Sequence, residues 1–218
     1  WTQLDQAVRD ALHASRSKVR LLTGPVTGTA TLSAINEFVA QFSGKHIAFT
    51  PDSNEAVREA AGWCYGLSSA PTYRFAAARS VVGFGADFLD HGSTRTVRDW
   101  AAARSVETHG EAAAQTVIFS AQATITGASA DRRYRVRSNH LPALAGALAK
   151  LVATALKAPA AALLGALDVK AVATTAGVSE KALQAVADRL VANAGASIVI
   201  AGGPDSTPEL EVAVNLLN

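Results

Sequence analysis

The residues best placed to do chemistry follow one apolar run. Residues 80–84 read Ser-Val-Val-Gly-Phe, and they lead into Gly85 and then into two carboxylates, Asp87 and Asp90. An apolar run that ends in closely spaced glycines and acidic residues is typical of a buried parallel strand that delivers a loop to a ligand crevice. We therefore predict a binding site at this strand end.

Two glycine-rich segments match known nucleotide-binding loops only in part. Residues 83–88 begin like a dinucleotide fingerprint, but Phe88 stands where the third glycine is needed, and the motif follows the third predicted strand rather than the first. Residues 23–28 follow the first predicted strand but lack the Lys and Ser/Thr of a P-loop. Neither a nicotinamide dehydrogenase nor a P-loop NTPase is indicated. These glycines also suit simple tight turns at strand ends.

The histidines and the cysteine form no recognisable catalytic or metal-binding pattern. The five histidines show no HxH or HExxH spacing, although His91 and His140 could converge at the crevice. The single cysteine, Cys64, excludes an internal disulfide and a cysteine-ligated cluster within this segment, and its place between Trp63 and Tyr65 predicts a buried apolar role. We predict no catalytic residue and no metal ligand.

A second segment carries a family resemblance. Residues 124–133 read Thr-Ile-Thr-Gly-Ala-Ser-Ala-Asp-Arg-Arg, and residues 86–90 read Ala-Asp-Phe-Leu-Asp. Both stretches resemble the molybdopterin oxidoreductase superfamily. The first is most similar to the Thr-Gly-Ala-x-Ala-Asp-His-Arg stretch in the large iron-sulfur subunit of alternative complex III, a bacterial quinol-oxidising respiratory complex. The resemblance extends from about Val19 to Asn218 and includes residues 201–204.

The resemblance implies a fold and a set of candidate cofactor contacts. The fold expected is α/β, a doubly wound, mostly parallel, Rossmann-like sheet of the molybdopterin-oxidoreductase central-domain type, with residues 1–218 an excerpt of a longer chain. In active members of the superfamily, a molybdopterin guanine dinucleotide lies at the carboxyl ends of the strands. The positions implied to contact it here are Gly85, Ala86, Asp87, Asp90, Ser120, Gln122, Thr124, Arg137, Ser138, Asn139 and His140.

One departure from the family pattern bears on function. Pterin-binding members usually continue after the arginine with Pro-Gly-Thr-Asp, whereas Ser-Asn-His-Leu follows Arg137 here, so the guanine-binding carboxylate is missing. We therefore expect a scaffold domain without a cofactor, in which any iron-sulfur clusters lie elsewhere in the parent chain. Its partners would be other subunits of a respiratory complex on the periplasmic side of the bacterial inner membrane. The main alternative is a dinucleotide-binding domain of an active molybdenum or tungsten oxidoreductase. An unrelated binding module, or a domain similar to the large peripheral subunit of proton-pumping NADH dehydrogenase, also stays open.

Composition limits the other classes of partner. The chain has 218 residues, of which 49% are hydrophobic, and a net charge of +2, which does not favour nucleic acid. No apolar run is long enough to span a bilayer, because Lys150, Lys157 and Pro159 interrupt the Ala/Leu-rich stretch from 141 to 167. A local cluster of Arg132, Arg133, Arg135 and Arg137 is expected to lie at an interface or in surface salt bridges.

Hydrophobic periodicity predicts an alternation of strands and helices. The helices expected are 4–14, 29–42, 54–61, 97–104, 141–157, 179–193 and 208–217. Crossover connections between parallel strands would bring the loops at Gly24, Gly85, Ala121 and Gly202 to one edge. The strands expected to share a single sheet lie near Val19, Ile47, Val81, Val117 and Ile198.

Overall fold

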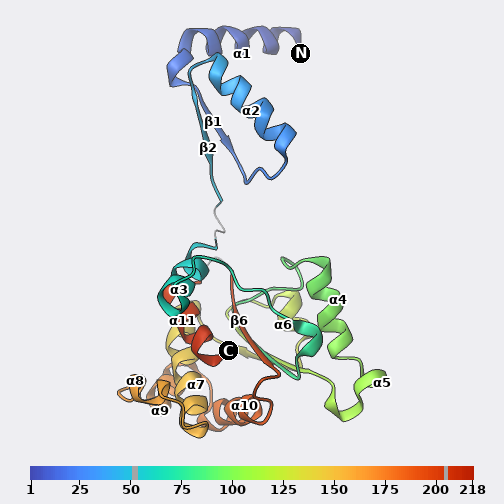
Figure 1. Ribbon diagram of the computed structural model, residues 1–218, viewed down its shortest axis with the longest axis vertical. Coiled ribbons are helices and arrows are strands. Elements are labelled where there is room, and N and C mark those ends of the chain that lie inside the picture. The colour runs from blue at the N-terminus through green and yellow to red at the C-terminus, as the bar shows by residue number, and fades with distance from the viewer. Residues whose placement is uncertain (51–53, 204–205) are drawn as a thin grey trace. The chain divides into compact units, whose positions relative to one another are not determined.

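A computed structural model describes residues 1–50, 54–203 and 206–218, and these residues form two compact units, 1–53 and 54–218 (Figure 1). The predicted turn residue Pro204 lies outside the described residues. Among the described helices, none has the combined length and hydrophobicity that a bilayer crossing requires.

The first unit is a helix followed by a βαβ arrangement. Its elements are α1 (Thr2–Ser15), a 3₁₀ turn η1 (Arg16–Lys18), β1 (Arg20–Thr23), α2 (Thr29–Gln41) and β2 (Lys45–Ala48). β1 and β2 pair in parallel, with Arg20 opposite Lys45 and Thr23 opposite Ala48. The strands and helices predicted in this part of the chain are confirmed.

The prediction of a single sheet that includes β1 and β2 is wrong. These two strands form a sheet of their own, separate from the four strands of the second unit. Arg20 and Lys45 open the two strands and are exposed, and burial in both strands stays partial. Charged side chains do not suit a strand that is buried on both faces, which is what the centre of a doubly wound sheet requires.

The second unit is a mixed α/β fold around a parallel sheet. Its four strands lie in the order β5-β4-β3-β6, and every neighbouring pair is parallel. The strands are β3 (Ser80–Phe84), β4 (Gln115–Ser120), β5 (Arg132–Arg135) and β6 (Ser197–Ala201). The predicted strands near Val81, Val117 and Ile198 therefore share one sheet, whereas the strand at 132–135 was not among the predicted strands.

Helices cover both faces of this sheet (Figure 1). The α-helices of the second unit are α3 (Glu55–Tyr65), α4 (Thr94–Ala103), α5 (Val106–His109), α6 (Ile125–Ser129), α7 (Leu141–Ala155), α8 (Ala160–Leu163), α9 (Val169–Ala176), α10 (Glu180–Ala192) and α11 (Pro208–Leu217). The 3₁₀ turns are η2 (Phe75–Ala77), η3 (Gly110–Ala112) and η4 (Ser138–His140).

Alternating side chains divide the sheet's two cores. On one face Phe84, Phe119 and Val199 pack against the buried sides of α7, α9, α10 and α11. On the other face Val81 and Ile118 pack with Phe75, Phe88 and Trp100, from η2, the loop after β3, and α4. The period-2 alternation of a strand thus supplies both layers, so that β3 is buried at every position.

The helix α3 packs against α11 through small residues, and one prediction about it is wrong. Its buried residues are Ala60 and Ala61, and its last turn is exposed, including Cys64. Cys64 is therefore not a core residue, because the buried part of the helix ends before the turn that carries it.

Candidate functional site

The carboxyl ends of β3 and β6 meet at a point where the chain changes direction across the sheet. From β3 the chain moves to β4 and β5 on one side, and it returns as β6 on the other side of β3. Such switch points leave a crevice outside the strand ends, which is where open α/β sheets bind ligands. Gly85 lies here with φ +68°, and a Cβ on it would stand 3.1 Å from the carbonyl oxygen of Gly202. The prediction that Gly85 and Gly202 lie at one sheet edge is confirmed.

A cavity of about 400 Å³ opens at this switch point. Its walls come from the loops after β3, β4 and β6 and from the start of α7. The described residues that line it are Gly85, Asp87, Asp90, His91, Ser120, Ala121, Gln122, Ala123, Thr124, Ile125, Ser138, Leu141, Gly202 and Gly203. Seven of the eleven residues that the resemblance implied as cofactor contacts are therefore brought together: Gly85, Asp87, Asp90, Ser120, Gln122, Thr124 and Ser138.

The other four implied contacts lie elsewhere. Ala86 points into the core beside Phe88, with 3% of its surface exposed. Arg137 and His140 line a separate hollow with Arg135 and the C-terminal end of α9. Asn139 is exposed and lines neither cavity. The predicted convergence of His91 and His140 is therefore not observed among the described residues, because the 3₁₀ turn η4 carries His140 to the other hollow.

Asp87 is held in place by the first turn of α6. Its Oδ1 accepts hydrogen bonds from the backbone N–H and the hydroxyl of Thr126, at 2.9 and 2.6 Å. The same hydroxyl oxygen accepts from the backbone N–H of Leu89 at 2.9 Å. This network ties the loop after β3 to the loop after β4, so it sets the shape of the crevice wall.

Asp90 and His91 stand on the rim of the crevice and are exposed. Their side chains approach each other to 3.5 Å between a carboxylate oxygen and Nε2. Together with Asp87 they place three donor groups within 4.8 Å of one another, a spacing that a cation could share. However, the hydrogen bonds from Thr126 already engage Asp87, and two of the three groups are solvated.

The turn after β4 is fixed by Arg133. Its Nε donates to the hydroxyl of Ser120 at 3.0 Å, and its Nη2 approaches the carbonyl oxygens of Ser120 and Ala121. At the far end of this turn, the side chain of Thr124 caps α6 by accepting from the N–H of Gly127. Of the crevice residues, Ser120 thus anchors Arg133 and Thr124 caps α6, so both have a structural role.

Asp131, the acidic residue of the Ala-Asp pair in the family-like motif, has a structural position at the opposite end of β4. Its carboxylate accepts from the N–H of Thr116 at 2.6 Å and from both terminal nitrogens of Arg104, at 2.6 and 3.2 Å. The guanidinium of Arg104 also lies over the ring of Trp100, 4.7 Å from its centroid. Asp131 therefore does not belong to the crevice. It joins the start of β5 to the N-terminal end of β4 and to Arg104, which follows α4.

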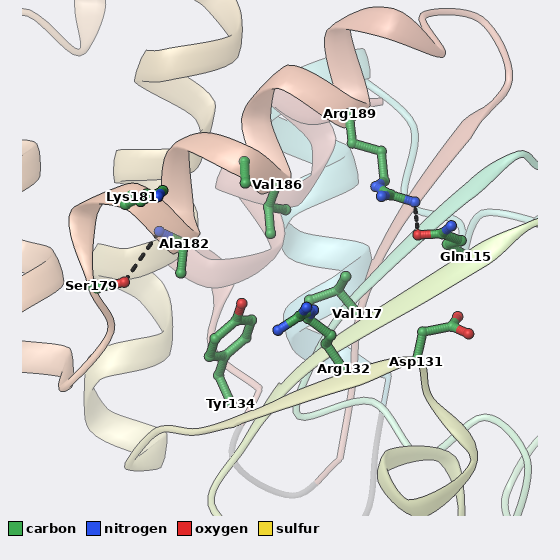
Figure 2. Close-up of a pocket in the computed structure, with 11 residues that line it drawn as sticks. Gln115, Val117, Asp131, Arg132, Tyr134, Ser179, Lys181, Ala182, Val186 and Arg189 are labelled. Carbon is green, nitrogen blue, oxygen red and sulfur yellow. Dashed lines mark hydrogen bonds between the residues drawn. The ribbon is translucent and has the colours of Figure 1, made fainter.

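A groove of about 430 Å³ between β5 and α10 was not predicted (Figure 2). Val117, Tyr134 and Val186 give it an apolar surface. Around that surface lie the cations Arg132, Lys181 and Arg189 and one carboxylate, that of Asp131, which is paired with Arg104. The sequence did contain a clue, because residues 181, 185 and 189 recur at helical spacing and so share a face of α10.

The four arginines of the cluster 132–137 do not share one role. Arg133 is committed to the turn after β4, whereas Arg132, Arg135 and Arg137 have no side-chain hydrogen bond to any described residue. None of the four forms an ion pair within the described residues, so of the two expected roles, interface or surface salt bridge, the second is not observed there and the first stays a prediction. The acidic residue nearest in sequence, Asp131, is paired with Arg104 instead.

The fold and the site together define an α/β protein with a parallel sheet and a ligand-type crevice at its switch point. No protein-family model and no curated protein matches the chain.

Proposed function

We propose that this chain is a cofactor-free scaffold domain of a membrane-associated respiratory complex, which passes electrons from quinol to an acceptor on the periplasmic side of the bacterial inner membrane. In this role the domain positions neighbouring iron-sulfur domains or subunits and binds no pterin itself. The likeness of residues 86–90 and 124–133 to alternative complex III supports the choice of complex.

The observation that supports the absence of a cofactor is the charge of the crevice. Its described lining includes Asp87 and Asp90 but no lysine or arginine. A pterin dinucleotide carries a diphosphate, and two like charges brought to about 4 Å at a protein surface repel by about 4 kcal/mol. Arg137 stands at the position of the arginine that the family pattern places near the cofactor, and in this structure it lines a different hollow. The residues present therefore do not fit the dinucleotide.

The second candidate is a dinucleotide-binding domain of an active molybdenum or tungsten oxidoreductase. One observation favours it, namely the 400 Å³ cavity at the switch point, whose glycine-lined walls allow a ligand to approach the backbone closely. The two candidates make opposite predictions about metal content.

The deciding experiment uses the full-length parent protein, purified in mild detergent from its native membranes. We expect elemental analysis to find iron but no molybdenum or tungsten, and oxidised extracts to show no pterin fluorescence. We also expect the preparation to oxidise a quinol and to contain other subunits. Stoichiometric molybdenum with extractable pterin would overturn the cofactor-free assignment. A parent that elutes alone, without iron or quinol oxidation, would overturn the assignment to a respiratory complex.

A further inference from the structure

One long side of β5 has no strand partner among the described residues. β5 is the end strand of the sheet, and its other side pairs with β4, from Val117 opposite Arg132 to Ser120 opposite Arg135. Val136 donates its N–H inward to the carbonyl of Ser120, so in this register the alternation of a parallel strand turns the backbone groups of Arg132 and Tyr134 inward to β4 and those of Arg133 and Arg135 outward. An open strand edge of this kind is a template for one more strand.

We propose that this edge of β5, together with the groove between β5 and α10, binds an extended acidic segment of a partner protein. The inference goes beyond the proposed function and does not depend on it, because it rests on the geometry and charge of this surface alone.

The charge of the surface fits such a partner. Arg132 and Lys181 are exposed and have no side-chain partner among the described residues. Farther along the same edge, Arg135 and Arg137 line the next hollow beside His140. The whole chain carries a net charge of only +2, so this concentration of cations is local. A run of carboxylates is the complementary partner.

The residues on the floor of the groove indicate which side chains the partner segment should carry. Tyr134 stacks on Phe119 at 5.2 Å, and Phe119 stacks on Phe84 at 5.1 Å, so the tyrosine ring is braced by the core. Figure 2 shows its ring facing the groove beside Arg132 and below α10. A strand laid along β5 would therefore meet a cation next to an apolar ring. Because Arg132 and Tyr134 are two positions apart and share this face of β5, an acidic residue and an apolar residue two positions apart in the partner match both.

The observations favour a polypeptide over a nucleic acid. The outward N–H and C=O groups of Arg133 and Arg135 are satisfied in register by another extended backbone, which supplies both donors and acceptors. A phosphate backbone supplies only acceptors, and its recognition draws on an extended basic surface. The near-neutral overall charge of this chain does not provide such a surface.

The test is a fluorescence-polarisation titration of the 218-residue chain with a labelled peptide of about eight residues, in which glutamate and valine take turns at every second position and threonine stands between them. We expect binding that weakens with added salt, and about threefold weaker binding for Arg132→Gln or Lys181→Gln, with about tenfold for the double variant. The matched control is Arg58→Gln, which removes an exposed cation from α3 and should bind as the unsubstituted chain does. Thermal melts verify that each variant is folded.

Two further probes separate strand addition from simple charge attraction. A peptide of the same sequence with alternate backbone nitrogens methylated cannot complete the ladder, and it should bind at least about tenfold more weakly. The same peptide with lysine in place of glutamate should not bind. Equal binding of the methylated peptide would overturn the proposal, as would unchanged affinity in the double variant. A single-stranded oligodeoxynucleotide that binds as tightly as the peptide would identify a polyanion surface instead.

Discussion

Removal of the Asp131 carboxylate tests whether the Ala-Asp pair of the family-like motif belongs to the fold or to a ligand. The carboxylate accepts from the backbone N–H of Thr116, a residue with no exposed surface, and from two nitrogens of Arg104. Arg104 lies over Trp100, whose indole N–H donates to the hydroxyl of Thr116 at 3.0 Å. Asp131→Ala therefore leaves a buried N–H and a half-buried guanidinium without their acceptor.

The expected loss follows from those two contacts. A buried N–H that loses a charged acceptor costs about 1.5 to 3 kcal/mol. The ion pair with Arg104 is partly solvated, with 23% and 38% of the two side chains exposed. It therefore adds only about 0.5 to 1 kcal/mol. We expect Asp131→Ala to lower the free energy of unfolding by about 2 to 4 kcal/mol, and Asp131→Asn, which keeps one acceptor oxygen, by about half of that.

Urea denaturation followed by circular dichroism measures this loss, provided that the slope with denaturant stays constant. The control is Asp188→Ala, because the exposed carboxylate of Asp188 bonds only to Gln184 one turn away, and its loss should stay within about 0.5 kcal/mol. If the stability of Asp131→Ala stayed within about 0.5 kcal/mol of that of the unsubstituted chain, which is about the error of the method, the structural role would be refuted. Equal losses for the alanine and asparagine variants would show that charge matters more than the acceptor for Thr116.

Two further perturbations test the crevice and the core. Gly85→Ala should cost about 1 to 3 kcal/mol, more than Gly177→Ala, because both glycines have positive φ but only Gly85 crowds the Gly202 carbonyl; equal losses would contradict the close approach at the switch point. Burial raises the pKa of the Glu211 carboxyl, against the opposing hydrogen bond from Ser206. Folding with a neutral Glu211 carboxyl favours the native state below the unfolded pKa, and this advantage is lost as pH rises through the raised folded pKa. Glu211→Gln should therefore become more stable relative to the unsubstituted chain as pH rises across that window; a flat or falling difference between their thermal melts would refute this.

The crevice at the strand ends could be predicted because a fully buried strand appears in the sequence as a continuous apolar run. Residues 80–84 form a continuous apolar run, and such a run has to be a central strand whose carboxyl end opens at the sheet edge. Helix starts could also be predicted where a capping side chain or a proline determines them. α11 begins at Pro208 after the Thr207 cap, and Ser179 accepts from the N–H of Ala182 at the start of α10.

The division into two sheets was harder to predict because pairing depends on contacts distant in sequence. Residues 20–23 and 45–48 have the length and spacing of parallel strands, and they do pair in parallel. What distinguishes them from β3 and β4 is the polar residues Arg20, Lys45 and His46, which are tolerated only in a sheet with incomplete cover. The apolar residues of these segments were enough to predict the two strands. Their polar residues indicate which sheet the strands join, and the prediction did not use them.

The edge strand escaped prediction for a related reason. Arg-Arg-Tyr-Arg has no apolar run, and only Tyr134 packs on the core, through its stack with Phe119. The strand is specified instead by its neighbours, since Asp131 and Val136 donate N–H groups to the carbonyl oxygens of Thr116 and Ser120 at its two ends. Tertiary hydrogen bonding of this kind overrides local propensity, which a single sequence does not report.

The placement of charge gives the two surfaces of the second unit different uses. The switch-point crevice has carboxylates on its rim and no cation among its described lining residues, although it has the geometry of a nucleotide site. Two exposed cations without a side-chain partner among the described residues, Arg132 and Lys181, instead flank the apolar groove between β5 and α10 and the open strand edge. A cofactor-binding domain needs its cations where the phosphates lie, whereas a scaffold needs them where its partners lie. A crevice whose described lining has no lysine or arginine, together with a groove that has both, therefore agrees with the proposed scaffold role, in which the domain would work through protein contacts.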